Sequence, residues 1–354
     1  MAHTGKIKKQ ENNIEKYWMA KFIKDYLLFT LKSATIILLF FGISLIVAVI
    51  GDKPKNKDIG SLTIKDLTNQ YYDVKNEMIN NIYTKTEAQK LTIDIKNSKI
   101  GKEGRIFVIK FDGDIQAKAV DSLKKEITAI LSIADHKDNV VLLLESPGGT
   151  VNGYGLAASE LERLTAKGLY LTVLIDKIAT SGGYMMAAIA DKIIAAPFAI
   201  IGSIGVLVES PNFNELLEKS GVKYEQITSG KYKRTVTMFG KNTEEDRQKV
   251  KEELNQIHSA FKLLIKSKRP NIDIENISTG EFWLGAQAKE LGLVDATMTS
   301  TDYLTSLYQE NKNVYLIKYE RKVPFAEKLI NSIGVVKNMI NQDNISSTIP
   351  MLKN

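Results

Sequence analysis

The sequence predicts an α/β fold with a largely parallel sheet, preceded by a membrane-spanning segment near the N-terminus. Three observations lead to this prediction. Short apolar runs alternate with stretches of helical spacing between residues 105 and 196. Each run is apolar nearly throughout, which is typical of parallel strands buried on both faces. The run from Ser33 to Ile50 carries no charge and is long enough for a membrane helix.

Composition narrows the classes of function. The chain has 354 residues, 44% hydrophobic and 25% charged, which fits one large domain with appendages, or two domains. The absence of cysteine excludes disulfides, thiolate nucleophiles and cysteine–metal sites. The net charge is +7, but the lysines are spread along the chain, so no nucleic-acid partner is predicted. No metal cluster, phosphate loop or cofactor motif is evident, and no cofactor is predicted.

The N-terminal region divides at residue 33. Residues 1–32 are polar and rich in lysine, and we expect residues 33–50 to form a transmembrane anchor, which the apolar residues 27–29 would lengthen. A buried core helix is one alternative, which the position ahead of any domain disfavours. A cleavable signal peptide is another, which the long preceding region and the lack of a small-residue cleavage site after Ile50 disfavour.

The charge bias around the span predicts its orientation. Seven lysines precede it, and three follow closely among acidic residues. The more positive side of a span lies in the cytoplasm, so residues 1–32 should be cytoplasmic and the bulk of the chain should lie across the membrane.

Residues 51–104 are charged and poor in aromatic side chains. We expect a helical stalk or connector here, because apolar side chains recur at rough helical spacing at Leu67, Tyr71, Val74, Met78 and Ile82. A turn over Gly101–Arg105 leads into the main domain, which we place at residues 105–300.

The first part of that domain reads as alternating strands and helices. Strands are expected over 105–111, 139–145, 169–175 and 192–196. Helices are expected over 120–133 and 151–167, the second ending before Gly168. In open parallel sheets, ligands bind beyond the carboxyl ends of the strands, where both Gly-rich turns of this region fall.

The second part of the domain is less regular. Residues 211–234 contain one strand-like run, Tyr224–Thr228. A long amphipathic helix should run from Thr243 to about Ser267, because Thr243-Glu-Glu-Asp provides a capping box at its start. Residues 281–295 should form a helix and a turn that close the domain.

The C-terminal region, residues 301–354, follows the domain. We expect a last strand over Val314–Tyr319, then an amphipathic helix from Phe325 to about Ile340, and a polar tail.

Ser181 is the candidate nucleophile. It lies in the almost uncharged stretch Ile178–Val208, between an apolar strand and a run of small residues. Small residues let a helix pack closely behind the serine, and the two following glycines let backbone N–H groups approach a ligand. A serine hydroxyl is a weak nucleophile that needs a base.

The histidines do not supply that base. His3 precedes the predicted span, His136 lies in a turn at the amino edge of the sheet, and His258 lies well inside a long helix. A Ser-His-Asp triad is therefore not predicted. Lysine is the remaining choice, since burial or cationic neighbours make a lysine neutral enough to act as a base. Spacing alone does not separate Lys233 from Lys177, Lys192 and Lys231.

The turn Ser146-Pro-Gly-Gly is a candidate oxyanion hole. Gly148 and Gly149 have free N–H groups and no side chain to block a ligand, and the N–H of Gly182 could join them around a developing oxyanion. A tight strand-to-helix turn is the simpler interpretation of a lone Pro-Gly-Gly. The second Gly-rich turn, after the next strand, favours the functional one.

Several segments together resemble the signal-peptide-peptidase-A family of Ser–Lys proteases, and most of all its SohB-type members, which carry an N-terminal membrane anchor. The resemblance is strong over residues 105–295 and looser for the anchor and stalk. It rests on ESPGGTVNGYGLAASEL, DKIATSGGYMMAAIADKIIAAPFAIIGSIGVL, PNFNELL, SGKYKRTVTMFGKNTEEDRQKVKEELN and TGEFWLGAQAKELGLVD.

The resemblance implies roles for individual residues. The serine of ATSGGY, Ser181, matches the family nucleophile, and the lysine of the G-x-Y-K motif, Lys233, matches the general base. Ser203 of IGSIGV matches a serine that helps to orient the base. The SPGG glycines match the oxyanion hole, with Gly148 the better candidate and Gly149 beside it.

The resemblance also implies a fold similar to that of the Clp protease and crotonase. Family members with one catalytic repeat form rings or domes in which serine and lysine come from neighbouring subunits. We therefore expect a homo-oligomer, with eight subunits, in the inner membrane with its catalytic domain on the periplasmic side.

The leading hypothesis is a membrane-anchored serine endopeptidase with a Ser181–Lys233 dyad. Its expected substrates are signal-peptide remnants or other short, apolar, unfolded segments near the membrane. A crotonase-like acyl-CoA enzyme is an alternative that has no use for a Ser–Lys pair and needs no anchor. A non-catalytic membrane scaffold is a third.

Overall fold

The structure is a computed structural model that describes residues 21–24, 26–42, 60–98, 104–310 and 312–321. It divides into two units, Gly60–Arg321 and a second unit that comprises Met1–Ile59 and Lys322–Asn354.

Among its described residues, the second unit has one apolar helix, Lys21–Gly42, which is long and apolar enough to cross a membrane and has exposed side chains. The helix begins upstream of the predicted start at Ser33, because the apolar residues 27–29 continue its apolar surface. The predicted residues 43–50 of the span lie outside the described residues.

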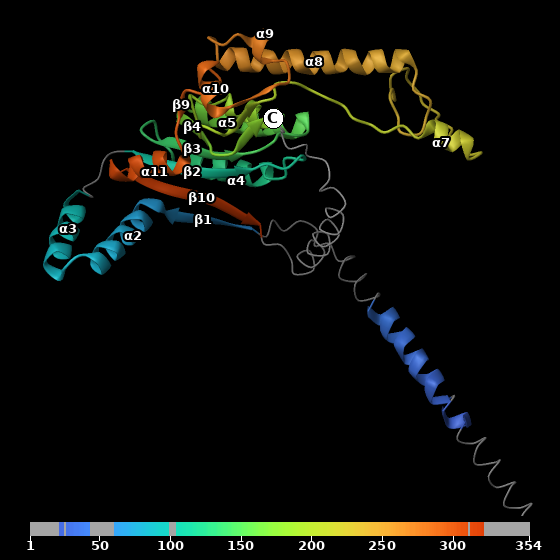
Figure 1. The fold of residues 1–354 in the computed structure, drawn as a ribbon, viewed down its shortest axis with the longest axis horizontal. Coiled ribbons are helices and arrows are strands. Elements are labelled where there is room, and N and C mark those ends of the chain that lie inside the picture. Colours follow the sequence, from blue (N-terminus) through green and yellow to red (C-terminus); the bar gives the residue numbers. More distant parts are fainter. Residues whose placement is uncertain (1–20, 25, 43–59, 99–103, 311, 322–354) are drawn as a thin grey trace, which may run out of the picture. The chain divides into compact units, whose positions relative to one another are not determined.

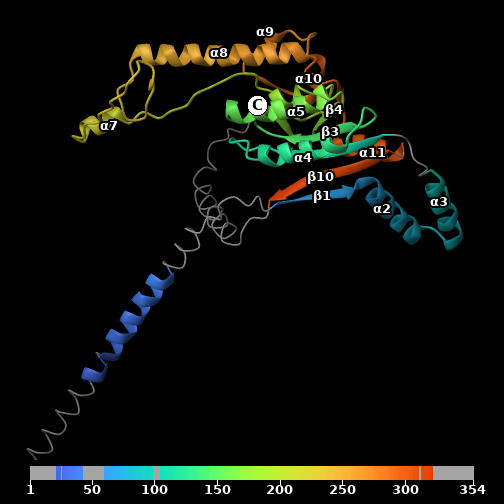
Figure 2. The ribbon, with the colours of Figure 1, turned by 180° about the vertical axis from the view of Figure 1, so that it is seen from behind.

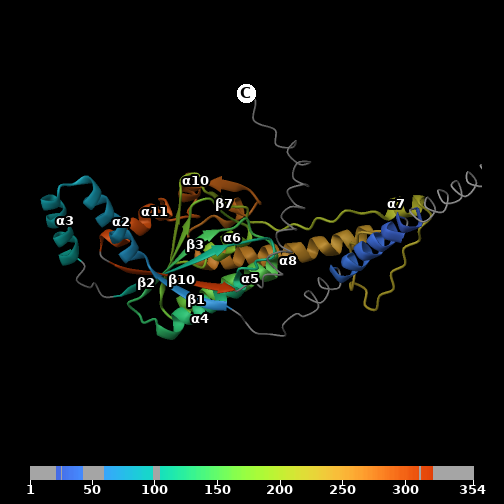
Figure 3. The same cartoon turned by 90° about the horizontal axis from the view of Figure 1, so that it is seen from below.

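The unit Gly60–Arg321 is built on a seven-stranded sheet with the order β1-β10-β2-β3-β4-β6-β9 (Figure 1). All neighbouring strands pair in parallel except β1 and β10, which pair antiparallel. Strand β1 is an edge strand, and β10 lies between it and β2 (Figure 3). The strands are β1 (Gly60–Asp66), β2 (Arg105–Asp112), β3 (Asn139–Glu145), β4 (Tyr170–Ile175), β6 (Lys192–Ala195), β9 (Ala296–Thr297) and β10 (Asn313–Arg321).

Alternating side chains of the central strands divide between two cores, because successive residues of a strand point to opposite faces. On one face, Phe107, Ile109 and Phe111 of β2 pack with helices α4 (Val120–Ile133) and α5 (Val151–Ala166). On the other, Ile106 and Val108 pack with α11 (Ser300–Gln309). A sheet covered on both faces is the α/β architecture that the apolar runs predicted.

A second, smaller sheet lies beside the first and has the order β5-β7-β8. Its strands are β5 (Ile178–Thr180), β7 (Ile200–Gly202) and β8 (Phe282–Leu284). The short helix α6 (Gly182–Ala187) follows β5 after one residue, and all its residues are buried. Helix α10 (Gly285–Glu290) follows β8 directly, so the predicted helix and turn over 281–295 also contain this strand.

Most predicted elements of the main domain are confirmed. The strands expected at 105–111, 139–145, 169–175 and 192–196 are β2, β3, β4 and β6, and the helices expected at 120–133 and 151–167 are α4 and α5. The long helix is α8 (Glu244–Lys268), and Thr243 and Asp246 form its capping box. The last predicted strand is part of β10.

Three predictions differ from the structure or lie outside it. Residues 60–66 are a strand rather than part of a helical connector, and helices α2 (Leu67–Ile82) and α3 (Lys85–Ser98) follow them. Tyr224–Thr228 is not a strand, since these residues are exposed and lie in an irregular segment without a partner strand. The predicted helix over 325–340 lies outside the described residues.

Helix α8 connects the sheet unit to an irregular segment, residues 206–243, which we call the arm. Phe261 and Ile265 of α8 are buried in the main core. The arm contains α7 (Asn214–Lys219), which Figures 1 and 2 show beyond the other end of α8, away from the sheet. No residue of α7 is buried.

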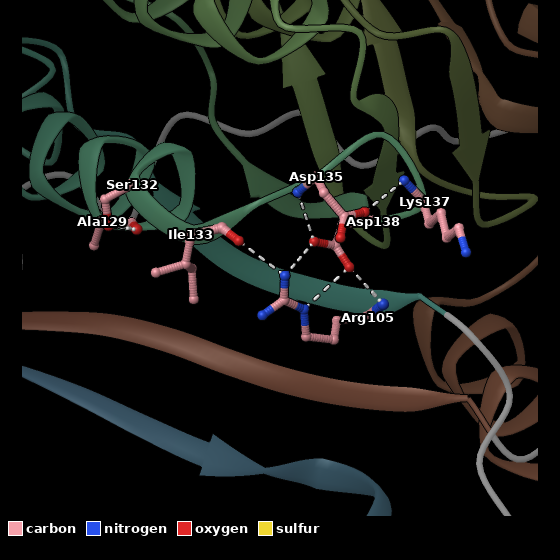
Figure 4. A network of polar contacts seen from close by, with 7 residues as sticks. All are labelled: Arg105, Ala129, Ser132, Ile133, Asp135, Lys137 and Asp138. Carbon is pink, nitrogen blue, oxygen red and sulfur yellow. Dashed lines mark hydrogen bonds and ion pairs between the residues drawn. The ribbon is translucent and has the colours of Figure 1, made fainter.

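The amino edge of the sheet is closed by an ion pair between Arg105 and Asp138 (Figure 4). Arg105 donates from its backbone N–H to Oδ1 at 2.7 Å and from Nη2 to Oδ2 at 2.6 Å. Burial raises the pKa of the Asp138 carboxyl, but the hydrogen bonds from Arg105 and from the Asp135 N–H outweigh burial, so the pKa is lowered. This ionised group ties β2 to the turn before β3, at the edge opposite the Gly-rich turns.

Candidate active site

Ser181 lies in a strained turn between β5 and α6. Its backbone has φ 51° and ψ −121°, a region that side chains other than glycine rarely enter. Such strain costs about 1–3 kcal/mol and persists only where the surroundings enforce it. The turn sets the half-buried Ser181 between the carboxyl end of β5 and the buried helix behind it. This agrees with the strand–turn–helix context expected of a nucleophilic serine.

Ser203 lies beside Ser181. Thr180 and Gly202 are register partners at the carboxyl ends of the parallel strands β5 and β7, and each serine is the next residue in the chain. The Ser181 N–H donates to the Gly202 carbonyl at 2.8 Å, and the Ser203 N–H donates to the Glu281 carbonyl at 2.6 Å. Ser203 also has a positive φ, 48°. The fold thus places two serines with positive backbone φ angles side by side.

The Ser146-Pro-Gly-Gly loop comes up against the same turn. Ser146 donates its N–H to the Ile178 carbonyl at 2.9 Å and accepts from the Thr180 N–H at 3.1 Å, which joins the loop to β5. Gly148 has φ +86°, and a Cβ there would lie 2.8 Å from the Ser181 Cβ. Only glycine fits this approach.

Of the three candidate oxyanion glycines, Gly148 lies against Ser181 and Gly182, Gly149 is the next residue of the loop, and their N–H groups differ. The buried Gly148 donates its N–H to Ser146 Oγ at 3.1 Å. Gly149 is exposed, and its N–H donates to no acceptor within the described residues. Gly182 is the first residue of α6, where an N–H has no partner within the helix. A Cβ at Gly148 would lie 2.7 Å from the Gly182 nitrogen, which places this N–H next to the loop.

Lys233 is exposed and lies in the arm, apart from Ser181 within one chain. Lys231, two residues earlier, pairs with Glu245 of the first turn of α8 at 2.6 Å. The first buried residue of α8 is Phe261. At 1.5 Å per helical residue, Glu245 and Phe261 are about 24 Å apart along the axis. One chain alone does not bring Ser181 and Lys233 together.

Lys233 lines an open pocket of about 670 Å³ within the arm. The aromatic side chains of Tyr224 and Phe239, with ring centroids 5.9 Å apart, form part of its wall. Exposed apolar side chains surround it, and Ile227 is 95% exposed. The arm therefore presents its lysine at a surface of mixed apolar and polar side chains that nothing in the described chain covers.

The other candidate bases lie elsewhere. His136 is in the turn at the amino edge of the sheet, between Asp135 and the Lys137 of Figure 4, and His258 is in α8. Lys177 pairs with Glu145 at 3.0 Å on the surface. His3 lies outside the described residues. Within the described ranges, no group of three or more histidine and acidic side chains could hold a metal ion.

Tyr154 is a residue of this region that the sequence did not single out. It lies in the first turn of α5, fully buried, and its hydroxyl contacts Ser146 Oγ at 2.5 Å. A Cβ on Gly182 would lie 2.4 Å from the Tyr154 ring. In the sequence, this tyrosine reads as one more apolar position of a helix.

Comparison with known proteins identifies relatives over most of the chain. Residues 21–161 match the model of the N-terminal part of peptidase family S49, and residues 163–314 match the model of peptidase family S49. The "Probable protease SohB" of Haemophilus influenzae is 41% identical over 86% of this chain and 91% of its own length. The protein of the same description from Buchnera aphidicola subsp. Acyrthosiphon pisum is 46% identical over 81% and 87%.

Among solved structures, a mutant of the 1510-N membrane-bound stomatin-specific protease aligns with a TM-score of 0.40 and 15% identity. The alignment covers 58% of this chain and 85% of that one.

Proposed function

Because the chain belongs to peptidase family S49 and is a serine protease of that family, we propose that Ser181 and Lys233 form its catalytic dyad. The observation that carries the proposal is the pair of strained turns at Ser181 and Ser203, with the Gly148 backbone against the Ser181 side chain. Strain of this kind persists where it sets up chemistry.

The reaction is an acyl transfer in two steps. Neutral Lys233 takes the proton of Ser181 Oγ while this oxygen attacks the carbonyl carbon of the scissile bond. The tetrahedral intermediate collapses, the C–N bond breaks, and the leaving amine takes the proton from Lys233. Water, deprotonated by the same lysine, then hydrolyses the acyl-enzyme and restores Ser181. No cofactor is needed for these steps.

Backbone N–H groups stabilise the oxyanion that forms in each step. The sequence favoured Gly148 as a donor, but its N–H donates to Ser146 Oγ, so the proposed donors are Gly149 and Gly182. Gly148 supplies the turn with positive φ that brings the loop against Ser181. Ser203 holds the Nζ of Lys233 toward Ser181 Oγ, since it lies beside Ser181 on the paired strand.

Lys233 reaches Ser181 from a neighbouring copy of the chain. The separation of the arm from the sheet within one chain supports this arrangement, as does the exposed apolar surface around Lys233. We propose a homo-oligomer, with eight subunits, in which each site is completed by the next subunit.

The substrates are short, unfolded, apolar peptide segments, including remnants of signal peptides, cut close to the membrane. The apolar helix Lys21–Gly42 supports an anchor in the inner membrane. The lysine-rich residues 1–32 lie on the cytoplasmic side, so the catalytic domain, residues 105–300, acts on the periplasmic side. The domain boundaries are part of the proposal.

A fluorophosphonate probe tests the dyad directly. Labelling should be lost in Ser181→Ala and Lys233→Ala, and retained in Lys231→Ala, whose surface ion pair with Glu245 contributes little to stability. Equal loss in the two lysine variants would contradict the choice of Lys233.

Mixing tests the shared site. When Ser181→Ala and Lys233→Ala subunits are co-assembled, a fraction of sites should combine an intact serine with an intact lysine and regain activity. Inactive mixtures with proven co-assembly would rule out the shared site.

A further inference from the structure

A pair of buried hydroxyl groups lies beneath the Gly-rich loop. Ser146 and Tyr154 are both fully buried, and their oxygens are 2.5 Å apart. The Tyr154 hydroxyl also donates to the Asp114 carbonyl at 2.8 Å, and Ser146 Oγ also accepts from the Gly148 N–H at 3.1 Å. The four groups form one continuous chain of hydrogen bonds.

The direction of every bond in this chain is determined. A hydroxyl has one proton to donate, and a carbonyl oxygen only accepts. The Tyr154 proton is therefore used on the Asp114 carbonyl, so Ser146 must be the donor of the 2.5 Å contact. The Gly148 N–H thus donates to the Ser146 hydroxyl, this hydroxyl donates to that of Tyr154, and Tyr154 donates to the Asp114 carbonyl. Burial raises the pKa of the Tyr154 phenol, which keeps its proton in place at neutral pH.

The chain joins the segments that surround Ser181. Asp114 belongs to the loop after β2, Ser146 and Gly148 to the loop after β3, and Tyr154 to α5. The Tyr154 ring also packs against Gly182, next to the nucleophile. A Cβ on Gly113 would lie 2.4 Å from both hydroxyl oxygens, so side chains and backbone enclose them.

We propose that Ser146 and Tyr154 are positioning residues of the oxyanion loop, which act by holding the Gly148 N–H inward. With this amide committed to Ser146, the loop turns at Gly148 and offers the Gly149 N–H, beside that of Gly182, to the substrate carbonyl. The inference rests on the proposed role of Ser181. Neither hydroxyl touches the substrate.

Kinetics of the full-length protein in detergent test this role. Tyr154→Phe keeps the ring that packs on Gly182 and removes the link between Ser146 and Asp114. Ser146→Ala removes the acceptor of the Gly148 N–H. We expect kcat to fall about tenfold to a hundredfold in each variant, with KM changed less than about threefold, because loss of a positioned oxyanion donor acts on the transition state.

The maximum rate of Ser181 phosphonylation by a fluorophosphonate should fall in parallel, since its phosphoryl oxygen occupies the same hole. The double variant should lose no more than Ser146→Ala alone, because both changes break one chain.

Tyr72→Phe is the matched control. Tyr72 is buried, and its hydroxyl also donates to a backbone carbonyl, that of Tyr308, at 3.0 Å, but it lies in α2. This variant should keep kcat, and all assays are run well below each variant's melting temperature.

Normal kcat and phosphonylation in Tyr154→Phe would overturn the inference, and so would equal kinetic losses in Tyr154→Phe and Tyr72→Phe. If Ser146→Ala does not fold, Tyr154→Phe decides alone. The proposed function fails separately, if Ser181→Ala keeps its activity.

Discussion

At the scale of single residues, the site depends on backbone conformations that its neighbours enforce. Ser181 and Ser203 are two of the three non-glycine residues with positive φ in the described parts of the chain. Hydrogen bonds from their own N–H groups, to Gly202 and Glu281, hold both turns. Strain held by the surrounding fold keeps the proposed nucleophile, Ser181, in one conformation before any substrate arrives.

Gly148→Ala should abolish activity and destabilise the fold. The new Cβ would lie 2.8 Å from the Ser181 Cβ, in addition to the strain of φ +86°. We expect a loss of about 3 kcal/mol or more in the free energy of unfolding, from strain and overlap together.

Gly168→Ala separates strain from overlap. Gly168 has φ +84°, but a Cβ there meets nothing within 4 Å, so this variant should lose about 1 kcal/mol and keep its activity. Denaturant unfolding and peptide hydrolysis measure both variants. Equal behaviour of the two would show that the approach to Ser181 does not matter.

The sequence could predict the glycines and Ser181, because turn chemistry is local. It could not predict the role proposed for Tyr154, which rests on a contact with Ser146 and on a hydrogen bond to Asp114, 40 residues away. Lys233 was chosen through the family resemblance, since nothing local distinguishes it from Lys231. The family itself is confirmed, and it sets aside the crotonase-like and scaffold alternatives.

At the scale of elements, strand β10 is held on its α4 side by a buried carboxyl group. Glu126 of α4 accepts the Tyr319 N–H at 2.7 Å through Oε1, while Oε2 is buried without a hydrogen bond. Burial raises the pKa of Glu126, against the smaller opposing effects of that hydrogen bond and of Lys318. Folding therefore shifts this carboxyl group toward its neutral form.

Glu126→Gln should change how stability depends on pH. A raised pKa in the folded state gives stability that is complete below the unfolded value and is lost as pH rises through the folded value. The glutamine cannot ionise, and its oxygen can still accept from Tyr319. The melting temperature of Glu126→Gln minus that of the wild type should therefore be larger at pH 8 than at pH 5. A difference that is constant over this range would contradict the prediction.

The central strands were predictable from the sequence, and the edge strand β1 was not. Strands β2, β3 and β4 are buried on both faces, so their apolar runs are unambiguous. Strand β1 is half exposed at the sheet edge, and its partner β10 lies more than 200 residues later. Pairing between strands so far apart in the sequence leaves no local pattern. The helical spacing of α2, which follows directly, therefore predicts a helical connector over β1 as well.

At the scale of the whole molecule, the compact unit Gly60–Arg321 begins ahead of the catalytic domain proposed for residues 105–300, and it includes β1. A domain that starts at residue 105, as the sequence suggested, would leave β10 as an open edge strand with unpaired backbone groups. The unit Gly60–Arg321 contains both strands and its own cores.

Two fragments test this boundary. A fragment of residues 60–321 should be soluble and melt cooperatively, whereas a fragment of residues 105–321 should aggregate or melt at a clearly lower temperature. Size-exclusion chromatography and thermal unfolding compare them. Equal solubility and equal melting temperatures would show that β1 is dispensable. Both fragments contain the arm, so its exposed surface cannot cause a difference between them.

The antiparallel pairing of β1 with β10 makes Gly60 and Arg321 register partners. The two ends of the unit therefore leave from one point on its rim, like the two strands of a hairpin whose loop has been cut. A short peptide bridge would close them, and new ends could then be opened elsewhere without altering a single sheet contact. A unit of this design is suited to circular permutation, and to insertion into a surface loop of another protein.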